Sequence, residues 1–143
     1  MVKSVFSYGR FHRIWPSTDR SGNVYVTVSA IRSFVKPFCK LFRSEDMGHS
    51  WIELADFFRI GEKNSTTGQP FILTDGTILV PVWDYRYYQF GRTGLAIYRS
   101  GDDGSSWERV YENPFGTYAN HFFEGECKEE IYLCAGMGGG GLE

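Results

Sequence analysis

The sequence contains the stretch Ser44-Glu45-Asp46-Met47-Gly48-His49-Ser50-Trp51 and, later, a second copy of the same pattern, Ser100-Gly101-Asp102-Asp103-Gly104-Ser105-Ser106-Trp107. Both copies read S-x-D-x-G-x-S-W, and each follows a short apolar run that ends in Arg. A pattern that recurs in two similar contexts is the sequence signature of repeated structural units. We therefore expect the chain to be built from units of similar fold.

The spacing within each copy predicts a tight hairpin turn. An Asp just after a strand can accept hydrogen bonds from backbone N–H groups further along the turn, and a Gly two residues later accommodates a positive φ. The serine hydroxyls can satisfy other polar groups of the turn. The Trp begins the next strand, and its indole N–H is available for a turn carbonyl. From the residues alone, each copy is interpreted as a structural turn without chemistry of its own.

These positions resemble the Asp-box, or BNR repeat, of the sialidase-like β-propellers. The matching residues are Ser44, Asp46, Gly48, Ser50, Trp51, Ser100, Asp102, Gly104, Ser106 and Trp107. In that family the box joins the third and fourth strands of a propeller blade and lies away from the active site. The resemblance implies an all-β fold made of sialidase-like β-propeller blades. It specifies fold better than function, because propellers of other functions carry the motif as well.

The order of β-branched and aromatic runs divides the chain into three units. Strands are predicted at 24–28, 38–43 and 51–54 in the first unit, at 70–73, 78–83, 95–99 and 107–111 in the second, and at 121–123 and 131–135 in the third, which carries no box. The expected blade units are about 11–57, 68–113 and 118–136, within one partial propeller domain, 1–141. Residues 142–143 resemble a cloning scar. No amphipathic helix is predicted.

Each full unit has about four strands in roughly 50 residues, so the chain supplies about two and a half to three blades, whereas a closed propeller has about four to eight. Uncovered blade faces and strand edges favour association. Two interpretations follow. A second copy can complete the ring, with a strand at 2–8 filling the half blade of its partner, so that a homodimer closes six blades. Alternatively, a longer chain supplies the remaining blades.

The composition fits this class and excludes others. Among 143 residues, 17% are aromatic and 17 are Gly, as in β-rich proteins with many turns. A net charge of −2 gives no general attraction to nucleic acid or to an anionic membrane, and no apolar run is long enough for a spanning helix. Three cysteines at unrelated spacings indicate buried thiols rather than a disulfide framework or a zinc site. The N-terminus lacks an apolar signal core, which favours a cytoplasmic protein over a secreted one whose signal was removed.

A second resemblance concerns ligand binding. The stretch Phe11-His12-Arg13-Ile14-Trp15-Pro16 is similar to the Phe-Arg-Ile-Pro element of sialidases, with two insertions. That element's Arg belongs to a triad that holds the substrate carboxylate, a task suited to a bidentate guanidinium. The resemblance implies this role for Arg13, and for Arg32 at a similar interval after a Gly. The corresponding strand end of the second unit carries Asp84, Tyr85 and Arg86. The alternatives are surface charges and packing between blades.

The departures from the family concern catalysis. Residues 33–37 contain no acid where sialidases carry the acid/base Asp, and nothing matches their Tyr nucleophile and its Glu partner. No catalytic residue, metal ligand or cofactor is therefore assigned. The sequence predicts a glycan-binding, catalytically incomplete propeller segment. A protein-interaction or assembly scaffold is the alternative, and a fragment of an exo-sialidase-like glycoside hydrolase is the third reading.

Overall fold

The computed structural model describes residues 13–30, 38–60, 65–84, 94–113, 117–124 and 131–137, and within them the fold is all-β apart from one short helix. The first sheet is antiparallel with strand order β1-β2-β3-β4. Its strands are β1 (Arg13–Thr18), β2 (Val24–Ala30), β3 (Phe38–Ser44) and β4 (Ile52–Asp56). A single helical turn, α1 (Phe57–Ile60), follows directly.

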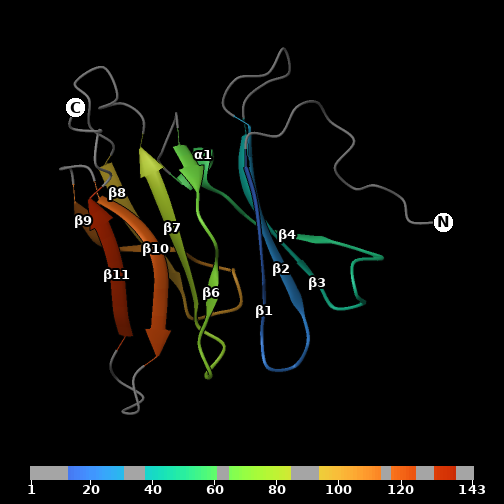
Figure 1. Cartoon of the computed structure of the whole chain (residues 1–143). Coiled ribbons are helices and arrows are strands. Elements are labelled where there is room, and N and C mark those ends of the chain that lie inside the picture. Colours follow the sequence, from blue (N-terminus) through green and yellow to red (C-terminus); the bar gives the residue numbers. More distant parts are fainter. Residues whose placement is uncertain are drawn as a thin grey trace.

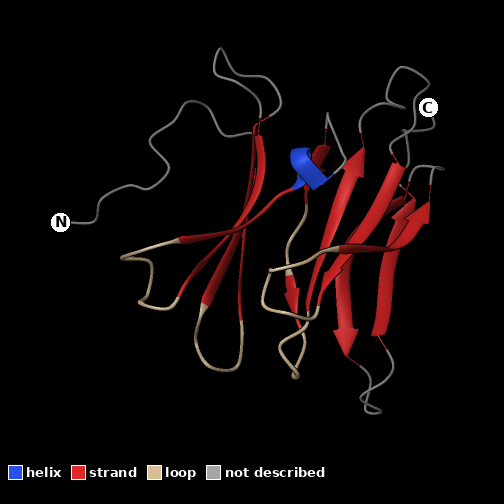
Figure 2. Cartoon of the chain, turned by 180° about the vertical axis from the view of Figure 1, so that it is seen from behind, coloured by secondary structure: helices blue, strands red, loops and turns tan. Residues whose placement is uncertain are grey.

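The second sheet has strand order β5-β7-β8-β9, and β6 also pairs with β7. Its strands are β5 (Ser65–Thr67), β6 (Phe71–Ile72), β7 (Ile78–Asp84), β8 (Gly94–Ser100) and β9 (Glu108–Asn113). The third sheet pairs β10 (Thr117–Glu124) with β11 (Ile131–Met137). The three sheets stand side by side, with the second between the other two (Figures 1 and 2).

The first two sheets repeat each other in register. Val24 at the start of β2 pairs with Ser44, and Ile78 at the start of β7 pairs with Ser100. Both sheets also have a register shift at the same place in their last strand pair, after Leu41 in one and after Ile97 in the other. A bulge re-aims the strand and frees backbone groups from the ladder. The repeat seen in the sequence is therefore a repeat of backbone geometry.

Alternation along the strands divides the apolar side chains between the two faces of each sheet. The main core lies between the first and second sheets. It comprises Tyr25, Cys39, Leu41, Ala55, Phe57, Ile78, Val80, Val82, Ala96 and Tyr98. On the opposite face of the second sheet, Leu79 and Ile97 form a smaller cluster with Phe71. Because β7 and β8 bury residues on both faces, the second sheet is an internal layer.

The all-β prediction is confirmed, and each predicted strand within the described residues is present with boundaries that differ by a few residues. The structure adds one four-residue helix, α1, that was not predicted. A one-turn helix has no apolar period to detect, and its local support is an Asp56 carboxylate that accepts the Phe58 N–H at 3.1 Å. Strands β1 and β5 were not predicted. Strand β1 contains Pro16, which is tolerated because β1 is an edge strand, and the three small polar residues of β5 carry no strand signal. The proposed strand at 2–8 lies outside the described residues.

Candidate functional site

The first turn, Ser44–Trp51, is held by its own side chains. Asp46 Oδ1 accepts the Ser50 N–H and the Ser44 hydroxyl, both at 2.8 Å, and Asp46 Oδ2 accepts the Ser50 hydroxyl at 2.6 Å. Ser44 Oγ accepts the Gly48 N–H at 2.8 Å, and the Trp51 indole N–H donates to the Gly48 carbonyl at 3.1 Å. Gly48 has φ of 90°. Each residue of the motif therefore has an identifiable role in closing the hairpin.

The second turn, Ser100–Trp107, repeats these bonds. Asp102 Oδ1 accepts the Ser106 N–H at 2.8 Å and the Ser100 hydroxyl at 2.9 Å, while Oδ2 accepts the Ser106 hydroxyl at 2.5 Å. The Trp107 indole N–H donates to the Gly104 carbonyl at 3.1 Å, and Gly104 has φ of 86°. Two turns with the same bonds at the same positions indicate that the motif encodes a local fold.

The carboxylates of both turns are stabilised in their charged form. The Ser50 hydroxyl and backbone N–H, followed by the Ser44 hydroxyl, lower the pKa of Asp46 from 3.8 to about 2. The equivalent donors, with the Ser106 hydroxyl first, lower the pKa of Asp102. Because the folded-state pKa lies below the unfolded one, this stabilisation is complete above the unfolded pKa and is lost as the pH falls through the folded pKa.

We expect the Asp46→Asn, Asp102→Asn double variant to show a weaker pH dependence of stability between about pH 4 and pH 2 than the wild type, because it lacks both titrating carboxylates. Urea unfolding at pH 5 and pH 2.5 measures this difference. At pH 5 the variant should be less stable, since an amide cannot accept every bond that the carboxylate accepts. Identical losses on acidification in the two proteins would contradict the assigned role.

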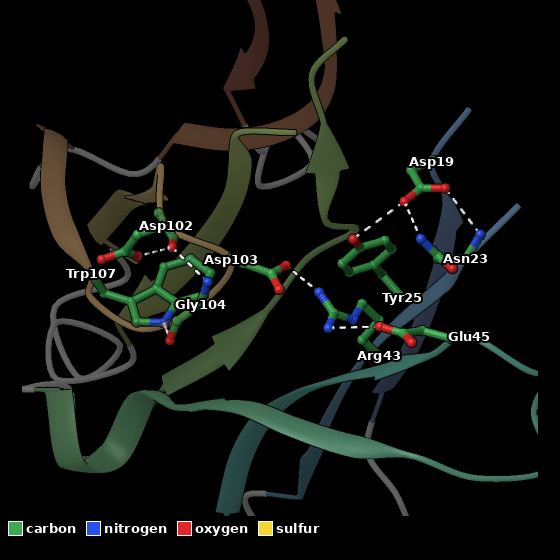
Figure 3. A network of polar contacts seen from close by, with 10 residues as sticks. Asp19, Asn23, Tyr25, Arg43, Glu45, Asp102, Asp103, Gly104 and Trp107 are labelled. Atoms are coloured by element: carbon green, nitrogen blue, oxygen red, sulfur yellow. Dashed lines mark hydrogen bonds and ion pairs between the residues drawn. The ribbon is translucent and has the colours of Figure 1, made fainter. Parts of the chain in front are cut away.

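The second turn also contacts the first sheet (Figure 3). The Trp107 indole N–H donates to the Leu54 carbonyl at 3.3 Å, at the bulge of β4. Gly104 lies against Leu54 so closely that a Cβ at this position would be 3.0 Å from the Leu54 Cβ. The Asp103 carboxylate pairs with Arg43, whose other terminal nitrogen pairs with Glu45 at 2.8 Å. The turn thus joins two sheets as well as two strands.

Arg43 belongs to a polar network that continues to the first hairpin of the chain (Figure 3). Tyr25 interacts with Arg43, and its hydroxyl donates to Asp19 at 3.4 Å. Asp19 in turn accepts the Asn23 backbone N–H at 2.9 Å and side-chain amide at 2.8 Å. These groups surround a turn and a sheet contact, so their arrangement is structural.

The ends of the strands opposite the two turns carry a different set of side chains. Arg13 begins β1 and pairs in register with Ser29 near the end of β2, whereas the first turn adjoins the start of β2. Trp83 lies near the end of β7, whereas the second turn adjoins its start. The Arg13 Cζ lies 5.1 Å from the centroid of a Trp83 ring. The two sheets therefore present an Arg and a Trp in contact at one common end.

Two buried hydroxyls lie beside this contact. Ser29 is opposite Arg13 in the ladder, and Thr66 is opposite Trp83. Within the described residues neither hydroxyl oxygen has a hydrogen-bond partner, although both are fully buried. Unsatisfied buried polar groups are few in native proteins and each calls for a structural or functional explanation. Here they lie in the buried part of the strand ends that carry Arg13. We name this region the strand-end site: Arg13, Ser29, Thr66 and Trp83.

The predicted ligand-binding residues are only partly placed. Arg13 is in the strand-end site, and Asp84 ends β7 next to Trp83 in the chain. Arg32, Tyr85 and Arg86 lie outside the described residues. The convergence of several Arg side chains therefore stays a prediction. Trp83 was not among the predicted site residues. Its position beside Asp84 at a strand end was visible in the sequence, but an apolar strand with a Trp is also the usual pattern of a core.

The described residues give little support for a metal site or for a reactive cysteine. No group of three or more His, Cys, Asp or Glu side chains there is arranged to hold a metal ion. Cys39 is a free, buried thiol, as predicted, and burial raises its pKa to about 12. A thiol of this kind is a poor nucleophile at neutral pH. In the described part of the chain no helix is long and apolar enough to cross a membrane.

Comparison of the sequence with known protein families and with curated proteins gives no match. The assignment of function therefore depends on the geometry of the two turns and of the strand-end site.

Proposed function

We propose that the chain is a sialidase-like Asp-box propeller segment that binds acidic glycans at the strand-end site and lacks a complete hydrolytic machinery. The observation that carries this proposal is the contact of Arg13 with Trp83 at the ends of two neighbouring sheets. A guanidinium recognises a sugar carboxylate in a bidentate manner, and Arg13 is only half-buried, so it can reach a ligand that the buried Trp83 ring cannot. The two turns lie at the opposite strand ends, as a structural motif remote from a ligand should.

The propeller arrangement belongs to the same proposal. In its support, the second sheet repeats the register of the first and buries residues on both faces. The second turn also fastens its own sheet to the preceding one through Leu54 and Arg43. Contacts of this kind can be repeated around a ring. We propose that the ring is completed by a second copy of the chain or by further blades of a longer chain.

The second candidate function is a protein-interaction or assembly scaffold. It is favoured by large apolar side chains that are exposed on the first sheet and its turn: Ile14 at 47%, Trp15 at 39%, Met47 at 82% and Ile52 at 50%. Exposed apolar surface of this kind marks sites of association when it is contiguous. A fragment of an exo-sialidase-like hydrolase is the third candidate, and hydrolysis of a fluorogenic sialoside would support it.

Arg13→Ala is expected to weaken binding of an acidic glycan about tenfold or more without changing the fold, because a charge-assisted bidentate contact is lost. A glycan array that displays sialylated, uronic-acid and neutral sugars, read at several protein concentrations, measures the effect. Arg99→Ala is the matched control. Arg99 is another arginine, but it lies on β8 near the second turn and pairs with Glu108 at 2.5 Å. Its side chain is 51% exposed, whereas Arg13 is half-buried.

The outcomes separate the candidates. Binding of acidic sugars that Arg13→Ala loses and Arg99→Ala retains supports the proposal. Equal losses in both variants would indicate a non-specific charge effect. If no glycan binds, and light scattering gives a mass well above the 16.4 kDa of one chain, the scaffold function is favoured instead.

A further inference from the structure

We propose that Trp83 is a positioning residue, whose indole ring holds the guanidinium of Arg13 in one orientation at the strand-end site. We call this ring the platform. Its use in ligand binding rests on the proposed function, whereas its contact with Arg13 does not. Arg13 and Trp83 come from different sheets, since β1 belongs to the first and β7 to the second. The contact therefore also fixes the position of the Arg relative to both sheets.

The geometry is that of a cation–π contact. The Arg13 Cζ is 5.1 Å from the ring centroid, within the distance of about 6 Å at which the ring quadrupole attracts a cation, and Trp is the most favourable ring for this. Trp83 itself is 4% exposed, so surrounding atoms hold its ring in place. A long, mobile Arg side chain loses conformational freedom against such a fixed surface, and it does so before any ligand arrives.

A glycine lies against the Trp83 ring where a side chain would not fit. A Cβ at Gly68 would lie 2.9 Å from a ring carbon of Trp83 and 2.9 Å from the Pro81 Cγ, which no side chain tolerates without a shift. Gly68 is itself fixed, because its N–H donates to the Pro81 carbonyl at 2.9 Å and its carbonyl accepts the Thr27 hydroxyl at 2.7 Å. The Gly68 backbone thus lies directly against the indole ring.

An aromatic platform has a specific advantage for an anion-binding Arg. A carboxylate partner would compensate the charge of the guanidinium and occupy its N–H donors. A ring face does neither. Within the described residues, no carboxylate forms an ion pair with Arg13, whereas Arg59 and Arg99 each have one such partner and Arg43 has two. Arg13 is thereby held in place with its charge and its in-plane donors available for a ligand carboxylate.

The first test needs no ligand. Two-dimensional NMR of the wild type should show the side-chain Hδ and Hε signals of Arg13 displaced upfield by the ring current of Trp83. Trp83→Leu should return them to ordinary positions, Trp83→Phe should keep part of the displacement, and Gly68→Ala should change it by moving the ring. The amide spectra of the variants show whether they are folded. Arg13 signals at ordinary positions in the wild type would overturn the proposal.

The second test uses glucuronate as the probe, with galactose as a neutral control. Trp83→Leu is expected to raise the Kd for glucuronate about fivefold, and Trp83→Phe should recover most of the affinity, which a purely packing role would not require. An unchanged Kd in folded Trp83→Leu would overturn the positioning role. If the wild type binds no glucuronate, the proposed function fails at this site. The ligand-free spectra then decide by themselves whether Trp83 holds the Arg13 guanidinium.

Discussion

Phe57→Ala is expected to lower the free energy of unfolding by about 3–5 kcal/mol, the usual cost of truncating a fully buried aromatic side chain. Phe57 is 0% exposed at the start of α1, and its ring contacts Tyr98 at 5.6 Å and Trp107 at 5.5 Å between centroids. It therefore fills the space where the end of the first sheet meets the second. Domains of this size are typically stable by only 5–15 kcal/mol, so the loss is a large fraction of the total.

Urea unfolding followed by tryptophan fluorescence measures the effect of this substitution. Phe57→Leu is the control, because it keeps most of the volume and should cost less than half as much. Similar stabilities for wild type and Phe57→Ala would show that the two sheets do not pack around this residue.

Trp107→Ala is expected to be more destabilising than Trp51→Ala, although both residues close equivalent turns. Each indole N–H donates to a glycine carbonyl within its own turn at 3.1 Å. Trp107 additionally donates to the Leu54 carbonyl and packs edge-on against Phe57. We expect about 3 kcal/mol for Trp107→Ala, from lost area and a carbonyl left without its donor.

The comparison of these two variants isolates the contact between sheets, because the loss of the turn bond is common to both. Unfolding in urea at one pH gives both values. Equal losses would mean that the second turn acts only within its own hairpin. A double variant that combines Trp107→Ala with Phe57→Ala should lose less than the sum, since the two rings share one contact.

Much of the fold could be predicted because it is encoded locally. The turn residues identified from spacing, such as Asp46 and Gly48, have the bonds and the backbone angle that their chemistry requires. Strands such as β7 follow from runs of β-branched residues. The contact of the second turn with Leu54 and Arg43 could not be predicted. It depends on how one sheet sits against another, and no spacing within a single motif carries that information.

The candidate site was predictable only in part. Arg13 was singled out through a resemblance, and its role in ligand binding stays a prediction. The neighbouring Trp83 could not be identified from the sequence, because the residues around it have the pattern of an ordinary buried strand. The close approach of Gly68 to the ring could not be predicted either, because a glycine in a loop can serve many purposes. Long-range contacts of this kind emerge from the stacking of sheets.

The most direct test of the account is the map of NMR shift changes when glucuronate is added to the uniformly ¹⁵N-labelled chain. We expect saturable changes that cluster at the strand-end site, around Arg13, Ser29 and Trp83, with none at the two turns and none on addition of galactose. Changes centred on Ser44–Trp51 or Ser100–Trp107, or no saturable change at millimolar glucuronate, would contradict the claim that the turns are structural and that the strand ends bind acidic sugars.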